Sequence, residues 1–123
     1  MWSRSVSDPS LLEVFPNPHR SRQYIIEHVV HEFTSLCPMT GHPDYAKLRV
    51  RYVADALCVE LKSLKEYLES FRNQGIFYED VTNVILNDLV ARCAPRWMVV
   101  KSVWNVRGGI HSVITAQNGQ PPS

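Results

Sequence analysis

Long apolar runs and an excess of one charge are both missing from this chain of 123 residues. No uninterrupted apolar segment approaches the length that crosses a membrane, and the polar N-terminus, which contains Pro9, lacks the apolar core of a signal peptide. The formal net charge is only +1, so charge gives no general affinity for nucleic acid or membrane surfaces. We therefore expect neither nucleic acid nor a membrane as a partner.

Paired cysteines and metal-ligand spacings are missing as well. Cys37, Cys58 and Cys93 give an odd number without CxxC spacing, so we expect thiols in a reducing cytoplasm and not a disulfide framework. The spacing HxxxH does not occur, and His28 and His31 would point to opposite faces of a strand, which argues against zinc. No GxGxxG follows a predicted strand, which argues against a Rossmann dinucleotide site.

The composition that remains is typical of one globular domain, with 45% apolar and 20% charged residues. A chain of this length buries a modest core, and association between subunits would help to bury more. We expect an extended, proline-containing arm over residues 1–22, a folded domain over 23–117 and a loose polar tail over 118–123.

Periodicity predicts six elements in the order strand, strand, helix, helix, strand, strand. The strands show β-branched runs or alternation, the helices show apolar residues at helical spacing, and glycine or proline follows each helix. The expected elements are strands over 24–33, 47–53, 97–106 and 110–116, and helices over 61–73 and 79–93. A four-stranded antiparallel sheet with two helices on one face, an α+β fold, satisfies this order.

The first predicted helix carries two lysines in its first turn, where the helix dipole disfavours cations. One explanation is that an anion from outside the chain, such as a phosphate, binds at the helix start. The other is that Lys62 and Lys65 pair at a solvated surface with Glu66 and Glu69, four residues further on. The spacing alone favours the second explanation.

Three more residues also have two explanations each. Cys37 lies in a loop directly after a predicted strand, where a cysteine is either an exposed nucleophile or a structural thiol. Asp44 follows a proline, as in many turns, and Glu79 is a favourable acid at a helix start. The local sequence alone favours the structural thiol for Cys37, and nothing in the spacing marks Asp44 as functional.

Two segments carry a family resemblance. Residues 60–65, Glu-Leu-Lys-Ser-Leu-Lys, resemble the signature hexapeptide of the NADPH-dependent 7-cyano-7-deazaguanine reductases, the nitrile reductases of queuosine biosynthesis. Residues 32–38 and 41–44 are similar to that family's catalytic loop, and the resemblance runs to about Gly109. It implies the tunnelling fold (T-fold), in which ββααββ units join edge to edge into barrels of several subunits, as in GTP cyclohydrolase I and urate oxidase.

The resemblance also implies a reaction. The nitrile of 7-cyano-7-deazaguanine would be reduced to the 7-aminomethyl compound with two NADPH, in the synthesis of queuosine in tRNA. Cys37 matches the nucleophile that forms a covalent thioimide, and Asp44 matches the general acid that protonates the nitrogen. At this length the protein would be the single-unit form, a homo-oligomer with sites between subunits.

The remaining implied residues fall into a substrate set and a cofactor set. A carboxylate can accept two parallel hydrogen bonds from a guanine-like ring, and several cations suit the phosphates of NADPH. Two positions depart from the family pattern, because many members have histidine at position 78 and proline at position 106. The resemblance assigns Val59, Glu60, Leu61, Tyr78 and Glu79 to the substrate, and Lys62, Lys65 and Arg107 to the cofactor.

Two other functions stay open at this point. Another enzyme of the same fold, such as a pterin or purine cyclohydrolase or an amidine-forming transferase, would lack the two-lysine helix start. A non-catalytic purine- or pterin-binding subunit would need Glu79 but neither Cys37 nor Asp44.

Overall fold

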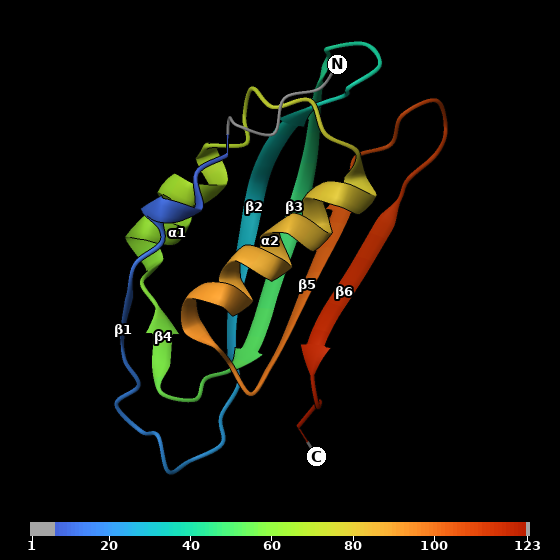
Figure 1. The fold of residues 1–123 in the computed structure, drawn as a ribbon. Coiled ribbons are helices and arrows are strands. Elements are labelled where there is room, and N and C mark those ends of the chain that lie inside the picture. Colours follow the sequence, from blue (N-terminus) through green and yellow to red (C-terminus); the bar gives the residue numbers. More distant parts are fainter. Residues whose placement is uncertain (1–6, 123) are drawn as a thin grey trace.

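A four-stranded antiparallel sheet with two helices on one face organises the chain (Figure 1). The computed structural model describes residues 7–122. Its elements are η1 (Pro9–Leu11), β1 (Val14–Pro16), β2 (Ile26–Leu36), β3 (Pro43–Val53), β4 (Leu57–Val59), α1 (Leu61–Glu69), α2 (Tyr78–Cys93), β5 (Trp97–Trp104) and β6 (Val113–Gly119). The strand order in the large sheet is β2-β3-β5-β6, which confirms the predicted α+β arrangement. None of the helices described is long and apolar enough to span a membrane.

The predicted elements all exist, but several bounds differ. Strands β2 and β3 continue toward each other until Leu36 pairs with Pro43, so most of the expected loop between them is sheet. Helix α1 ends at Glu69, before the expected end at Asn73, and β6 is displaced to Val113–Gly119 from the predicted 110–116. These bounds depend on pairing with distant segments, which local periodicity does not report.

The segment expected to be an N-terminal arm is extended but lies against the domain. Strand β1 pairs with β4 in a second, two-stranded sheet that was not predicted. Leu12 is 1% exposed in the core, and its carbonyl accepts a hydrogen bond of 2.8 Å from Nε of Arg92 on α2. Residues 1–6 and Ser123 lie outside the described residues, and Asn118 of the expected tail belongs to β6.

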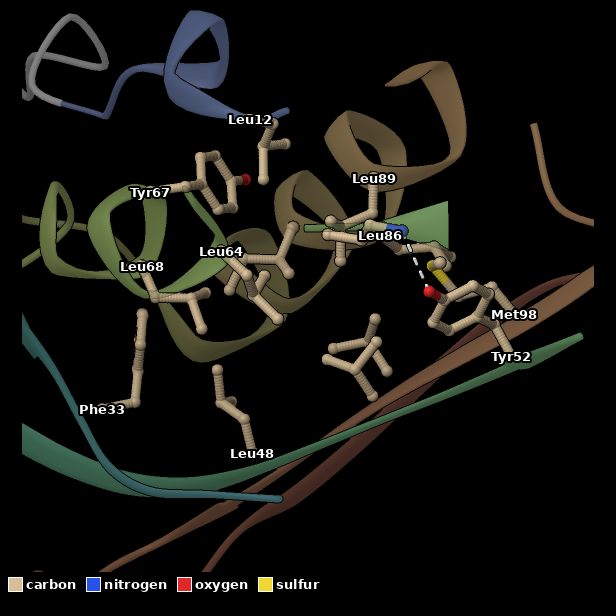
Figure 2. Packing of buried hydrophobic residues seen from close by; sticks show 14 of the residues in the cluster. Leu12, Phe33, Leu48, Tyr52, Leu64, Tyr67, Leu68, Leu86, Leu89 and Met98 are labelled. Carbon is tan, nitrogen blue, oxygen red and sulfur yellow. Dashed lines mark hydrogen bonds between the residues drawn. The ribbon is translucent and has the colours of Figure 1, made fainter. Parts of the chain in front are cut away.

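The core lies between the helices and the inner face of the large sheet (Figure 2). Each apolar side chain buried there contributes about 1.5–3 kcal/mol. The hydroxyl of Tyr52 accepts the Val59 N–H at 3.0 Å inside this core. Burial raises the pKa of Tyr52 to about 12, so the hydroxyl stays neutral. Leucines of both helices meet the sheet in this layer, namely Leu64, Leu68, Leu86 and Leu89.

A β-bulge in β2 decides which side chains face the helices near the candidate site. The register of β2 against β3 shifts between Val30 and Phe33. Val30 packs against the core before the shift, whereas Phe33 and Ser35 are buried after it. The bulge therefore turns Ser35, and with it the end of β2, onto the inner side opposite Asp44.

Candidate active site

The loop between β2 and β3 presents Cys37. The Cys37 N–H donates to the His42 carbonyl at 2.8 Å, and the Gly41 N–H donates to the Cys37 carbonyl at 2.8 Å. Gly41 has φ 74°, a left-handed conformation that glycine adopts without a steric penalty. The loop is thus closed by its own backbone, and two long strands hold it in place.

The end of β2 is also tied to the segment between the two helices. The Leu36 N–H donates to the Gln74 carbonyl at 2.9 Å, and the Ile76 N–H donates to the Leu36 carbonyl at 3.1 Å. Leu36 and Gly75 form an isolated parallel bridge there. This bridge brings the start of α2 next to the Cys37 loop, although the two are far apart in the sequence.

A pocket of about 240 Å³ lies where these segments meet. Its wall combines a thiol, two carboxylates, a phenol and a guanidinium with apolar side chains. Half of the ten residues that the resemblance assigned are brought together in it: Cys37, Asp44, Tyr78, Glu79 and Arg107.

Hydrogen bonds lower the pKa of the Cys37 thiol. The side chain of Thr40 has the largest effect, followed by the backbone N–H groups of Met39 and Thr40. Burial and the charge of Asp44 act in the opposite direction but are weaker. Because the thiolate is the nucleophilic form of cysteine, this loop favours attack on an electrophile.

We expect Thr40→Ala to slow the alkylation of Cys37 by iodoacetamide near neutral pH. Loss of the hydroxyl moves the pKa of Cys37 up toward its ordinary value, so the rate should fall about two- to tenfold near pH 7 and recover at higher pH. Peptide mass spectrometry over a pH series measures this rate. Thr40→Ser keeps the hydroxyl and is the matched control, and an unchanged pH profile in Thr40→Ala would contradict the assignment.

Asp44 is buried beside the pocket and forms an ion pair with Arg107. Asp44 is 4% exposed, and Nη1 of Arg107 contacts its Oδ1. Arg107 begins a tight turn in which Gly108 and Gly109 have φ 57° and 79°, as a two-residue hairpin turn of type I′ requires. The structure therefore places Arg107, which the resemblance assigned to cofactor phosphates, against the carboxylate of Asp44 and apart from Lys62.

Tyr78 lies between Asp44 and Trp104. Its ring stacks on the indole of Trp104 with centroids 3.9 Å apart and planes at 8°. Burial has the largest effect on its pKa, and the charge of Asp44 and a hydrogen bond to it raise the pKa of Tyr78 further. The phenol therefore stays neutral and can donate to the carboxylate, a role that the histidine of many family members would fill with an imidazole.

Glu79 is the second residue of α2 and is exposed at the pocket. It shares the first turn of the helix with Asp80. This position satisfies both explanations given above, since the acid complements the helix dipole and its carboxylate is open to a ligand.

Three of the other assigned residues line a separate groove, whereas Val59, 4% exposed, and Glu60 line neither the groove nor the pocket. A cavity of about 1110 Å³ runs between α1 and the edge strand β2, and Leu61, Lys62 and Lys65 line it. Pro43 lines this groove, whereas the next residue, Asp44, lines the pocket. None of the residues that line the groove also lines the pocket, so the two are separate within one chain.

The start of α1 is capped by its own chain. The Glu60 carboxylate accepts the N–H groups of Lys62 and Ser63 at 2.7 and 2.8 Å, and these hydrogen bonds lower the pKa of Glu60. A carboxylate of the chain itself thus occupies these two N–H groups, so a phosphate at this helix start would have to be bound by the lysine side chains. The Glu60 N–H in turn donates to the Glu13 carbonyl at 2.9 Å.

One of the two expected lysine pairs forms. Nζ of Lys62 lies 3.5 Å from Oε1 of Glu66 at an exposed surface. Glu69, the expected partner of Lys65, pairs instead with Arg72 at 3.7 Å. Within residues 7–122 no carboxylate lies at ion-pair distance from Lys65. Lys65 therefore has its charge available to a ligand in the groove.

Thr40 and Trp104 are residues of the site that the sequence did not indicate. A threonine in a loop and a tryptophan at the end of a strand have no distinctive spacing, and the second resembles an ordinary core residue. The three cysteines are free thiols, as predicted, with Cys58 and Cys93 buried. In the described part of the chain no three His, Cys, Asp or Glu side chains gather as metal ligands.

Comparison with known proteins gives a consistent picture. The family model described as QueF-like protein matches residues 43–123. A protein of Anaeromyxobacter sp. (strain K) is 56% identical over 91% of this chain and 92% of its own length. One from Chlorobaculum tepidum is 55% identical over 85% of this chain and 90% of its own length. Both relatives are named NADPH-dependent 7-cyano-7-deazaguanine reductase.

A solved structure supports the fold. The crystal structure of the archaeosine synthase QueF-Like in the apo form superposes with a TM-score of 0.74, covering 80% of this chain and 96% of that chain. The two sequences are 19% identical, so the likeness concerns the fold alone. Together with the observed element order, it confirms the predicted tunnelling fold.

Proposed function

The chain belongs to the family of NADPH-dependent 7-cyano-7-deazaguanine reductases, and on that premise we propose that it reduces the nitrile of 7-cyano-7-deazaguanine to the 7-aminomethyl compound. The pocket that unites Cys37, Asp44 and Glu79 is the observation that carries this proposal. It offers a nucleophile, a proton donor and a carboxylate for the base within one small volume. The reaction consumes two NADPH per nitrile and belongs to queuosine biosynthesis.

The first step joins the enzyme and the substrate covalently. The Cys37 thiol gives its proton to the Asp44 carboxylate and adds as a thiolate to the nitrile carbon. Asp44 passes this proton to the nitrogen, so a C–S and an N–H bond replace the S–H bond and one π bond of the nitrile, and no group leaves. The lowered pKa of Cys37 and the position of Asp44 in the same pocket support these roles. Arg107 orients the Asp44 carboxyl, and Glu79 pairs with the N–H groups of the base.

The later steps need hydride and a dry pocket. Bound NADPH would supply the hydrides for two reductions, that of the thioimide attached to Cys37 and that of the imine left when the Cys37 sulfur departs. Cys37 thus holds the substrate until the first reduction is complete, and the apolar part of the wall, Ile76 and Phe77, limits the access of water to the imine.

The groove beside α1 fits a phosphate-bearing dinucleotide. Its volume of about 1110 Å³ suits a large ligand. Lys62 and Lys65 supply positive charge on the α1 side, whereas Arg72 is paired with Glu69, and Glu27 and Glu32 line the opposite side. We assign the phosphates of NADPH to Lys62 and Lys65. Arg107 belongs to the catalytic pocket in this assignment.

The groove and the pocket complete one site only between two copies of the chain. They share no lining residue within one chain, and in this proposal the groove of one subunit meets the pocket of the next. The edge strand β2 supports such an association. Apart from the bridge of Leu36 to Gly75, no strand within residues 7–122 pairs with its outer edge, and Ile25 and Val29 are exposed there. Leu61, 59% exposed in the groove, then contacts the substrate of the neighbouring subunit.

The two lysines of α1 give a prediction that separates cofactor binding from surface pairing. Lys62→Ala and Lys65→Ala should each raise the Michaelis constant for NADPH, because each charge-assisted contact contributes about 1.5–3 kcal/mol, roughly one to two decades in affinity. Adduct formation with the nitrile should stay intact, since it needs no hydride. Steady-state kinetics with varied NADPH measures the first effect.

Glu66→Gln is the matched control for that experiment. It removes the ion-pair partner of Lys62 but keeps the lysine, so NADPH kinetics should not change. If the lysine only paired at the surface, both Lys62→Ala and Glu66→Gln would cost under about 0.5 kcal/mol of stability and nothing in NADPH binding. Sedimentation of each variant distinguishes a lost contact from a lost assembly.

Product analysis tests the proposed function as a whole. The protein, the nitrile and NADPH should yield the 7-aminomethyl compound, with two NADPH oxidised for each nitrile consumed. Tight purine binding without oxidation of NADPH would instead indicate a non-catalytic binding subunit.

The three free thiols also support a cytoplasmic location.

A further inference from the structure

A closed series of contacts behind the pocket begins and ends at Tyr78. The ring of Tyr78 stacks on Trp104, and Nε1–H of Trp104 donates to Oγ of Ser102 at 2.9 Å. The hydroxyls of Ser102 and Thr82 lie 2.7 Å apart, and Oγ1 of Thr82 donates to the Tyr78 carbonyl at 2.8 Å. Both the side chain and the backbone of Tyr78 are therefore held.

The hydrogen bonds in this series can have only one direction. Thr82 uses its proton on the Tyr78 carbonyl, so Ser102 must donate to Thr82, and Ser102 then accepts from the indole. Each hydroxyl donates once and accepts once, and no donor competes with another. Thr82 and Ser102 are 0% exposed and Trp104 is 1% exposed, so water does not replace any of these bonds.

Local helix geometry explains only one of the hydrogen bonds in this series. A threonine hydroxyl often bonds the carbonyl four residues earlier in a helix, and that contact alone has a local explanation. Ser102 and Trp104, however, come from β5 and face the core, where an apolar side chain is the usual choice. The hydroxyls of Thr82 and Ser102 and the indole N–H of Trp104 together hold the start of α2 and the ring of Tyr78 in place.

We propose that Trp104 is a positioning residue of the reaction: its stack and its hydrogen bond through Ser102 and Thr82 hold the Tyr78 hydroxyl at Asp44. The inference rests on the proposed function, since Asp44 is the proton donor there. A tyrosine ring that can tilt carries its hydroxyl away from the carboxyl, because the oxygen lies at the far end of the ring. Because the indole of Trp104 lies parallel to it, the ring of Tyr78 has one orientation. Asp44 therefore keeps its contact with the Tyr78 hydroxyl while the nitrile nitrogen takes the proton.

A double-mutant cycle tests this role. The rate of thioimide formation is followed by absorbance after mixing the protein with the nitrile without NADPH, for Trp104→Phe, Tyr78→Phe and the double variant. Trp104→Phe should slow adduct formation about tenfold while the affinity for the nitrile changes little. In the Tyr78→Phe background the same change should cost nothing more, because the hydroxyl that it positions is already gone. If the rate of adduct formation in the double variant fell by the product of the two single losses, the proposal would be overturned.

Trp97→Phe is the matched control. Trp97 stands at the other end of β5, is also buried, and donates Nε1–H to Gln117 at 3.1 Å. Its replacement should leave the rate unchanged, and an equal loss there would reduce Trp104 to a packing residue. Thr82→Val breaks the same series with little change in volume, and its loss of rate should likewise vanish in the Tyr78→Phe background even if Trp104→Phe does not fold.

The two proposals fail in different ways. If the unaltered protein forms no adduct with the nitrile, the proposed function is wrong. If the unaltered protein forms it and Trp104→Phe and Thr82→Val form it at the same rate, the positioning role alone is wrong.

Discussion

Cys37→Ala is expected to abolish nitrile reduction while the base still binds. The side chain supplies the only covalent bond between enzyme and substrate in the proposed reaction, and without it neither hydride transfer has an activated carbon to reach. Turnover should fall by more than about 10³-fold. Oxidation of NADPH measures turnover, and calorimetry with the nitrile measures binding, which depends on Glu79 and should stay within about threefold.

Cys58→Ala is the control for this variant. Cys58 is a buried thiol of the core, so its removal changes packing but leaves the pocket lining as it is. Normal turnover in Cys58→Ala with none in Cys37→Ala assigns the chemistry to one sulfur. Residual turnover of Cys37→Ala within tenfold of the unaltered protein would remove Cys37 from the mechanism.

Glu79→Gln and Glu79→Leu should weaken substrate binding far more than NADPH binding. Glutamine keeps the shape but loses the charge and turns a donor toward the donors of the base, so we expect a loss of about ten- to a hundredfold. Leucine removes both acceptors and should cost more than about a hundredfold, because a site built for hydrogen bonds is left with unpaired groups. Equilibrium titration with each ligand measures both effects.

Asp80→Asn distinguishes ligand binding from helix stabilisation. Asp80 is the next acid in the same first turn of α2 but does not line the pocket. If Glu79 only complements the helix dipole, the two variants should lose similar stability, about 0.3–1 kcal/mol, and neither should change binding selectively. Equal losses for substrate and NADPH in Glu79→Gln would support that helix explanation.

The sheet and the helices could be predicted because their residues repeat with a clear period. Alternation over residues 47–53 and the helical spacing in residues 61–73 each report a buried face directly. Strands β1 and β4 are three residues long, too short for a period to be visible, and β1 contains Pro16. Leu12 is buried, and its carbonyl accepts a hydrogen bond from Arg92 of α2, a distant contact that no local pattern reveals.

The site residues were found through the family motifs, and their grouping depended on contacts that the sequence does not encode locally. The bridge between Leu36 and Gly75 brings Cys37 to the start of α2. The ion pair of Arg107 with Asp44 was not predicted. Glu60 as a helix cap was missed because glutamate is not among the residues usually preferred at that position.

The mass of the intact protein after incubation with 7-cyano-7-deazaguanine alone tests the central claim most directly. Addition of the Cys37 thiol across the nitrile releases nothing, so the mass should rise by the full mass of one nitrile per chain. Digestion should place the addition on the peptide that contains Cys37, and addition of NADPH should remove it. A protein that keeps its original mass at saturating nitrile, or carries the addition on Cys58 or Cys93, would contradict the covalent mechanism proposed for this pocket.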